Sequence, residues 1–243
     1  MGDDEITESA KAVQEVAKAT GKALDVSEKV GSFVAKVIGE PLESAVGMLS
    51  DRLRFMRWER QIRMVDRCEE IMRKRRIEGK TRAVPPKLAL PIIENASLEE
   101  NNQLQDLWAN LLSSALDPNF KGTLRSAFID IIKQLEIVDA HILSFLYRSY
   151  LNSIKMKEIS EDESPSVIGW GCDEITTALK MSNSVYENSV DNLMRVRCVK
   201  PLVLKVTGIR AGNEPMTIDK GYDVICLTSL GKSFVEACMI LPD

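Results

Sequence analysis

Few residues in this sequence are of the types that usually carry catalysis. Its 243 residues include one histidine, His141, and Asp139 lies two positions before it, on a different face of any helix. The five cysteines stand at positions 68, 172, 198, 226 and 238, and no two lie within four residues of each other. The sequence therefore lacks a Cys-x-x-Cys motif. We expect no catalytic residue, no metal site and no cofactor, and reduced, partly buried thiols typical of a cytosolic protein.

The tripeptide Gly231-Lys232-Ser233 invites comparison with a phosphate-binding P-loop. In that motif an earlier glycine stands where this sequence has Cys226, and the tripeptide here follows Thr-Ser-Leu instead of a glycine-rich loop. The backbone that cradles phosphate is therefore missing. We interpret the tripeptide as the polar start of the last helix.

Positive charge is concentrated in one segment of an otherwise acidic chain. The net charge is −4, yet residues 51–82 contain twelve Lys and Arg against six acids. Residues 1–50 contain five against nine, and residues 83–243 contain fifteen against twenty-one. Such an asymmetry is typical of a contact with phosphate, a membrane or an acidic partner.

The basic segment and the lysines before it form the first candidate site. Lysines at 11, 18, 22, 29 and 36 stay on one helical face, because their steps of seven and four follow the helical period. Phe55 and Trp58 lie among arginines, as at a lipid interface. The alternative is a solvated helical face, since acids alternate with the arginines. The candidate residues for contact with an anionic surface are Lys22, Lys29, Lys36, Arg52, Arg57, Trp58, Arg60 and Arg63.

Apolar spacings of three and four predict the elements that would position these residues. Helices are expected over about 10–38 and 42–76, separated by Gly39-Glu40-Pro41, and the two could pack as an antiparallel hairpin. Further helices are expected within 85–137. Ser97 and Glu100 would form a capping box, and Asp117-Pro118 would end the helix that follows. Another helix is expected over about 123–135.

The last region combines helices with the only expected strands. We predict a helix that begins at Asp139, a short one from Cys172, a longer one capped by Ser182 and a terminal one over 228–238. Two β-like runs, 202–207 and 222–227, flank a turn over 210–221. This order is typical of a winged helix-turn-helix. The expected fold is mostly α, with an N-terminal helical hairpin (1–82), a helical middle (83–137) and a C-terminal winged helix-turn-helix with a small β-hairpin (138–243).

A winged helix raises the prospect of DNA binding, which the charge does not favour. The recognition helix would expose Ser184, Tyr186, Glu187, Asn188 and Asp191. From Cys172 to Cys198 there are three basic residues and four acids, whereas phosphate contacts supply most of the affinity for DNA. We therefore favour a winged helix that binds protein, with a DNA-binding transcriptional regulator as the alternative. The candidate residues of the recognition helix and wing are Asn183, Tyr186, Lys205 and Arg210.

No segment of the sequence predicts a transmembrane helix. The longest run without a charged residue is ten residues, Leu107 to Leu116, whereas a spanning helix needs about 20. The N-terminus is acidic and polar, unlike a secretory signal. We expect a cytoplasmic protein that can contact the inner face of the membrane peripherally.

Several motifs between about 40 and 145 resemble the Abi-alpha family of bacterial abortive-infection proteins. The resemblance includes Gly39-Glu40-Pro41-Leu42-Glu43, Arg57-Trp58, Pro86 to Glu99, Leu104 to Leu112, Ala115-Leu116-Asp117-Pro118, Phe128-Ile129 and Asp139-Ala140. It implies a role in defence against phage and brings no catalytic residues with it. We expect a non-enzymatic protein whose N-terminal helices act at an anionic surface or partner. Its winged helix would sense or hold a protein or a phage component, and a homo-oligomer also remains open.

Overall fold

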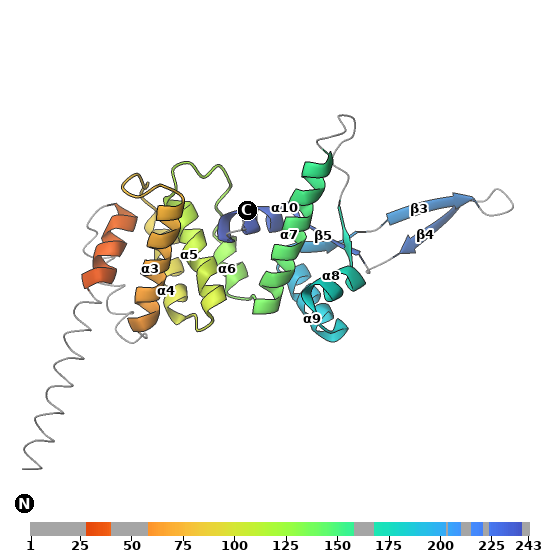
Figure 1. Cartoon of the computed structure of the whole chain (residues 1–243), viewed down its shortest axis with the longest axis horizontal. Coiled ribbons are helices and arrows are strands. Elements are labelled where there is room, and N and C mark those ends of the chain that lie inside the picture. Colours follow the sequence, from red (N-terminus) through yellow and green to blue (C-terminus); the bar gives the residue numbers. More distant parts are fainter. Residues whose placement is uncertain are drawn as a thin grey trace, which may run out of the picture. The chain divides into compact units, whose positions relative to one another are not determined.

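The computed structural model describes residues 28–39, 58–157, 168–202, 204–209, 215–220 and 224–239. These residues are mostly helical, and a small three-stranded antiparallel sheet lies near the C-terminus (Figure 1). The prediction of a mostly α fold is therefore confirmed. The remaining parts of the expected N-terminal hairpin, 10–27 and 42–57, lie outside the described residues.

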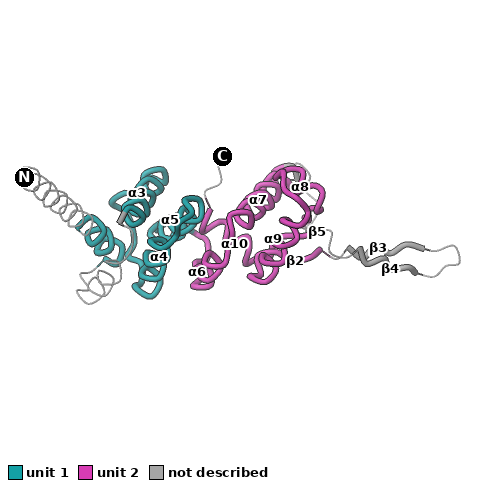
Figure 2. The backbone as a smooth tube through the Cα atoms, turned by 90° about the horizontal axis from the view of Figure 1, so that it is seen from below, with its two compact units in different colours: residues 1–120 teal, residues 121–243 magenta. Residues whose placement is uncertain are grey.

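The chain divides into two compact units, Met1–Phe120 and Lys121–Asp243 (Figure 2). The first unit contains the helix over 28–38, α3 (Trp58–Lys74), α4 (Pro86–Leu98) and α5 (Asn102–Leu116). The sequence suggests boundaries after residues 82 and 137. In the structure α3, α4 and α5 pack against one another within the first unit.

Helix α5 is the central helix of the first unit. All of its residues from Leu104 to Leu116 are buried except Asp106. A helix that is covered all round must satisfy its polar groups within the protein, and Gln105, Asn110, Ser113 and Ser114 lie among its buried residues. Helix α3 covers one side of it with an apolar stripe at helical spacing, formed by Met64, Val65, Cys68, Ile71 and Met72.

The expected capping box at Ser97 is wrong. Ser97 lies in the last turn of α4 and donates its hydroxyl hydrogen bond to Ile93 O, 2.7 Å away. Asn101 is the N-cap of α5, and its Oδ1 accepts from the amides of Gln103 and Leu104. An N-cap residue must lie just before its helix. Because α4 extends through Leu98, α5 begins later than expected, and its N-cap is Asn101, four residues after Ser97.

Helix α3 ends in a Schellman motif with an arginine in the left-handed position. Arg76 has a φ of 56°, its amide donates to Arg73 O, and the amide of Ile77 donates to Met72 O, both at 3.0 Å. Ile77 is 2% exposed and supplies the apolar contact that accompanies this motif. Glycine is the usual residue at such a position.

The second unit consists of helices around the small sheet. Its elements are α6 (Ala127–Ile132), α7 (Ile137–Lys157), β1 (Trp170–Gly171), α8 (Cys172–Leu179), α9 (Asn183–Arg195), β2 (Val199–Pro201), β3 (Leu204–Ile209), β4 (Pro215–Lys220), β5 (Val224–Leu227) and α10 (Ser229–Cys238). The predicted starts of α8 at Cys172 and of α9 after Ser182 are confirmed. Helix α7 begins two residues earlier than Asp139, whose Oδ2 accepts from the amide of Glu136 at 2.9 Å.

Strand pairing differs from the predicted hairpin. In the three-stranded sheet β5 lies between β1 and β2, and Trp170 pairs with Ile225 while Val199 pairs with Leu227. Strands β3 and β4 form a separate antiparallel pair in which Leu204 is opposite Lys220. The expected turn over 210–221 therefore contains strand β4, and the expected strand at 202–207 pairs with β4 and not with 224–227. Hairpin register depends on pairing partners, which alternation along one strand does not specify.

The core of the second unit brings α10 against α6 and β2. The Phe128 and Phe234 rings meet edge to face with centroids 5.7 Å apart. Gly231 lies so close to the backbone just before β2 that a Cβ there would come within 2.0 Å of the carbonyl oxygen of Cys198. Lys232 Nζ lies 3.7 Å from the centroid of the Tyr150 ring, a cation–π contact with α7. Gly231 and Lys232 of the tripeptide Gly231-Lys232-Ser233 therefore have packing roles.

Candidate functional site

Much of the positive charge of α3 faces α5. Arg60, Arg63 and Arg67 follow one another at steps of three and four, so they lie along one face of the helix. Opposite them α5 presents Asn102, Gln105 and Asp106. We call these six residues the α3–α5 seam.

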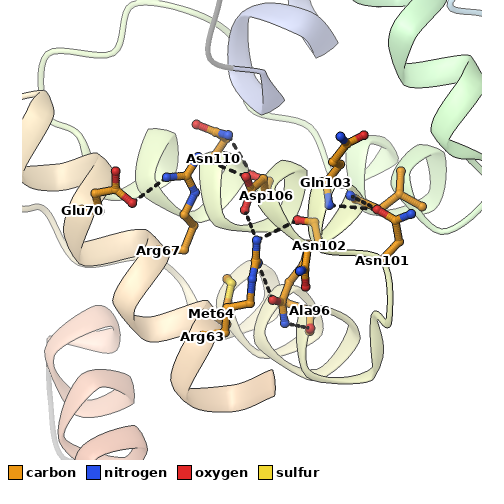
Figure 3. Close-up of polar contacts among 12 residues, drawn as sticks. Arg63, Met64, Arg67, Glu70, Ala96, Asn101, Asn102, Gln103, Asp106 and Asn110 are labelled. Carbon is orange, nitrogen blue, oxygen red and sulfur yellow. Dashed lines mark hydrogen bonds and ion pairs between the residues drawn. The ribbon is translucent and has the colours of Figure 1, made fainter. Parts of the chain in front are cut away.

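The seam is joined by direct hydrogen bonds and ion pairs (Figure 3). Arg63 Nη2 lies 3.0 Å from Asp106 Oδ1, and Arg67 Nη2 lies 3.0 Å from Asp106 Oδ2. Arg60 Nη1 donates to Asn102 Oδ1 at 2.6 Å. One carboxylate thus holds two guanidinium groups, which fixes the register of the two helices.

Gln105 extends the seam into the interior. It is fully buried, and its Nε2 donates to Ala96 O at 2.8 Å and to Arg60 O at 3.0 Å, while its Oε1 accepts from Arg63 Nη1 at 2.6 Å. One amide therefore contacts α3, α4 and α5. Such a network favours one arrangement of the helices. Any other arrangement would leave a buried polar group of Gln105 or of its partners without a hydrogen bond.

On the side away from Asp106, the seam continues to Glu70. The pKa of Glu70 is lowered to about 2 by the hydrogen bond from Lys74 and then by that from Arg67, at 2.7 and 2.5 Å. Burial lowers the pKa of Arg67, but its hydrogen bonds to Glu70 and Asp106 outweigh this and the net shift is upward. The charged forms of Glu70 and Arg67 are therefore stabilised by their partners, as is typical of a structural ion-pair network.

Beneath the seam, the buried Cys68 thiol is not poised for chemistry. Burial raises its pKa to about 12. The thiol therefore stays protonated at neutral pH, whereas a reactive cysteine needs its thiolate. Arg75 lies nearby, donates from Nη1 to Ser114 Oγ at 2.9 Å and has its pKa lowered by burial.

A second group of basic residues, most of them exposed, gathers where α3 ends. We call residues 73–87 the basic turn; they contain seven Lys and Arg and one acid, Glu78. The exposed basic residues in the turn are Arg73, Lys74, Arg76, Lys80, Arg82 and Lys87. Arg73 Nε lies 3.5 Å from Glu78 Oε1, and Arg82 Nε donates to Ala115 O. Arg76, Lys80 and Lys87 make no side-chain hydrogen bond or ion pair within the described parts of the chain.

A comparison of the sequence with models of protein families gives a match that covers most of the chain. The sequence model for abortive infection alpha matches residues 59–238. The chain belongs to the abortive infection alpha family. The match covers the α3–α5 seam and nearly all of the second unit, and it confirms the resemblance seen in the sequence. Neither the comparison with curated proteins nor that with solved structures gave a significant match.

In this abortive infection alpha protein, the predicted surface residues occupy several environments. Lys29 Nζ pairs with Asp66 Oδ1 at 2.6 Å, and the pKa of Lys29 is raised chiefly by that hydrogen bond. Lys36 is exposed on the helix over 28–38. Arg60 and Arg63 belong to the seam. Trp58 is the first residue of α3, but its side chain, like Lys22, Arg52 and Arg57, lies outside the described residues.

The predicted recognition helix corresponds to α9, with one correction. Asn183 is exposed, but Tyr186 is 4% exposed and belongs to the buried face with Ser189, Val190 and Leu193. The expectation that Tyr186 points to solvent is therefore wrong; Val185, 41% exposed, takes the outward position. Both residues are apolar enough to fill a core face, so spacing alone did not identify the buried one. Lys205 lies in β3, and Arg210 is outside the described residues.

Sequence reasoning missed the residues that organise the first unit: Arg67, Gln105 and Asp106. An acid on a helix otherwise free of charge, between Gln105 and Leu107, was the available signal. Within the described residues no group of three His, Cys, Asp or Glu could hold a metal ion, and no helix there is long and apolar enough to cross a membrane.

Proposed function

We propose that this protein acts in abortive infection without catalysis, by contacting an anionic membrane surface through its N-terminal unit. The second unit would hold a protein partner or a phage component. The proposal rests on the two groups of basic residues in the first unit. Arg60, Arg63 and Arg67 bind α5 in the seam, whereas most basic residues of the basic turn are exposed to solvent.

The exposed charge is sufficient for reversible attachment. Each basic residue close to an anionic leaflet contributes about 1 kcal/mol, so Arg76, Lys80 and Lys87, helped by the exposed cations beside them, would hold the protein reversibly at a membrane. Attachment of this kind is weakened by salt, since the Debye length falls to about 8 Å at physiological ionic strength. The protein would therefore respond to changes in surface charge.

Flotation of the full chain with vesicles tests the proposal. We expect the protein to float with vesicles of equal parts phosphatidylglycerol and phosphatidylcholine at low salt, and to stay at the bottom with phosphatidylcholine alone. Failure to float with the anionic vesicles at low salt would make the first unit a scaffold or an oligomerisation element instead.

We also propose that the second unit is a winged helix that binds protein. The order of α7, β1, α8, α9, β2, the β3–β4 pair and β5 supports this, as does the pairing of β1 with β5 beside β2. The exposed face of α9 includes Glu187 and Asp191, which would repel DNA phosphates. Fold alone does not assign a ligand, so the charge favours protein.

A gel shift with the DNA upstream of the gene separates this proposal from the alternative, a transcriptional regulator. We expect weak binding at most, without sequence preference. Specific binding abolished by Asn183→Ala and Arg210→Ala together would support the regulator. Tyr186 is unsuitable for this test, since changing a buried residue also alters stability.

Assays of nuclease, nucleotidase and NADase activity on the purified protein test the proposal that it is not an enzyme. We expect no turnover above background in any of these assays. Turnover that one substitution in this chain removes would show that the protein is an enzyme.

A further inference from the structure

Three helices of the described structure end on an exposed basic residue in a conformation that favours glycine. Arg76, Lys180 and Arg197 have φ values of 56°, 53° and 62°, and they are the non-glycine residues with positive φ within the described ranges. Each follows a helix, namely α3, α8 and α9. A side chain with a Cβ is disfavoured there, so glycine would make the same turn at lower energy.

Two of these ends have the same hydrogen bonds. At the end of α9, the amide of Arg197 donates to Met194 O and that of Cys198 to Leu193 O, at 2.9 Å each. These are the counterparts of the bonds from Arg76 and Ile77 at the end of α3. Arg76 and Arg197 therefore share a backbone setting, and they differ in what surrounds them.

A cation at a helix C-terminus is favoured by the helix dipole, which offers a purely structural reason for an arginine. At α3 that role is already filled, since Arg73 and Lys74 occupy the last turn. Arg76 adds little to the dipole interaction, and its side chain makes no hydrogen bond or ion pair with any residue the structure describes. A strained residue without a partner among the residues that the structure describes points to a role outside the fold.

The surroundings of Arg76 show what that role requires. It is the fourth residue of the basic turn, in which Glu78 is the one acid among fifteen residues and is already paired with Arg73. Lys80 follows it, beyond Gly79, whose φ is 71°. The turn therefore presents several cations on one short stretch of backbone.

We propose that the basic turn is the surface by which the first unit contacts anionic phospholipid headgroups, with Arg76 as its principal contact. This inference rests on the proposed function and names Arg76 as the side chain within the basic turn on which the contact chiefly depends. A layer of headgroups imposes no fixed register, which suits a cluster of long, flexible cations. Specific DNA recognition instead places a helix or a β-ribbon in a groove, whereas Arg76 and Lys80 lie in the turn that follows α3.

Replacing Arg76 with glycine distinguishes a role in membrane binding from a role in stability. We expect Arg76→Gly in the full chain to raise the Tm by about 2–4 °C, because it relieves the left-handed strain. The same variant should lose about fivefold in its partition onto vesicles of phosphatidylglycerol and phosphatidylcholine at low salt. Arg76→Lys should leave both values near those of the wild type. Arg197→Gly is the matched control, since it removes one charge and one strained residue in the second unit; it should raise the Tm and leave partition unchanged.

Each outcome bears on one proposal. Wild-type protein that does not bind the anionic vesicles overturns the proposed function and this inference together. Wild-type protein that binds while Arg76→Gly binds equally well overturns the inference alone. An equal loss in Arg197→Gly means that net charge and not the basic turn controls binding. A lower Tm for Arg76→Gly means that the arginine is a structural cap, and a loss of binding to duplex DNA but not to vesicles assigns the turn to nucleic acid.

Discussion

Arg67 Nη2 lies 3.0 Å from Asp106 Oδ2, and this contact ties the basic face of α3 to the central helix of the first unit. The other oxygen of Asp106 lies 3.0 Å from Arg63 Nη2. All three side chains are about one-quarter to one-third exposed, at 26%, 26% and 31% for Arg67, Asp106 and Arg63. Part of the basic segment is therefore a structural element, although its composition suggested a surface.

We expect Asp106→Asn to lower the free energy of unfolding by about 1–3 kcal/mol, because it removes the carboxylate that two part-buried guanidinium groups share. Urea denaturation followed by circular dichroism measures the change. Asp66→Asn is the matched control. It breaks the ion pair with Lys29, whose side chains are 43% and 54% exposed, and should cost less than about 1 kcal/mol. Equal effects of the two variants would contradict a structural role for the seam.

Stability at acid pH should depend on Glu70. Its pKa is lowered from an ordinary 4.5 to about 2, chiefly by Lys74, so the unfolded chain binds the proton more readily than the folded protein. The stabilising contribution is therefore fully present above about pH 4.5 and is lost as the pH falls toward 2. We expect Glu70→Gln to lower the Tm at neutral pH and to differ less from wild type at the acid end of this window. Glu69→Gln gives the effect of removing a neighbouring charge, and high salt should reduce the Glu70 effect because the side chain is solvated.

The position of the α5 cap gives a third prediction. Asn101→Ala should cost about 1 kcal/mol of stability, because the amides of Gln103 and Leu104 lose their acceptor. Ser97→Ala removes only a hydroxyl that donates to a carbonyl already within a helix, and we expect a smaller effect. Thermal unfolding of the two variants ranks them, and the reverse order would restore the capping box at Ser97.

Gly231 should not tolerate a side chain. The carbonyl oxygen of Cys198 would lie 2.0 Å from a Cβ at this position, so we expect Gly231→Ala to cost about 3 kcal/mol or more or to prevent folding. Gly31 lies in the helix over 28–38, and no atom of the residues that the structure describes lies within 4 Å of the place that a Cβ would take there. Gly31→Ala should therefore stabilise the protein by about 0.5–1 kcal/mol. Soluble yield and chemical denaturation compare the two.

Local signals in the sequence identified the elements that depend on local structure. Asp117-Pro118 ends α5, and Ser182 caps α9, because the backbone groups involved lie within four residues of these side chains. The mostly helical class likewise follows from apolar spacing along single helices.

The sequence did not identify features that depend on distant partners. Asp106 and Arg63 are 43 residues apart, and nothing within either helix shows that they meet. The pairing of β5 with β1 and β2 also joins distant segments, so alternation within 222–227 could not identify its neighbours. The burial of Tyr186 depends on the element that covers α9. The candidate surface was therefore predicted as a segment, but its division into a seam and a basic turn was not.

The contacts of Asp139 have a kinetic consequence. Its Oδ2 accepts a hydrogen bond from Asn192 Nδ2 at 2.6 Å, and the two residues are 53 positions apart. The start of α7 is therefore completed only when α9 has docked, after a long loop has closed and its entropy has been lost. We therefore expect this end of α7 to form late in folding, and the local turns of α8 and α9 to form early. Removing the Asn192 amide should then accelerate unfolding and leave the refolding rate nearly unchanged.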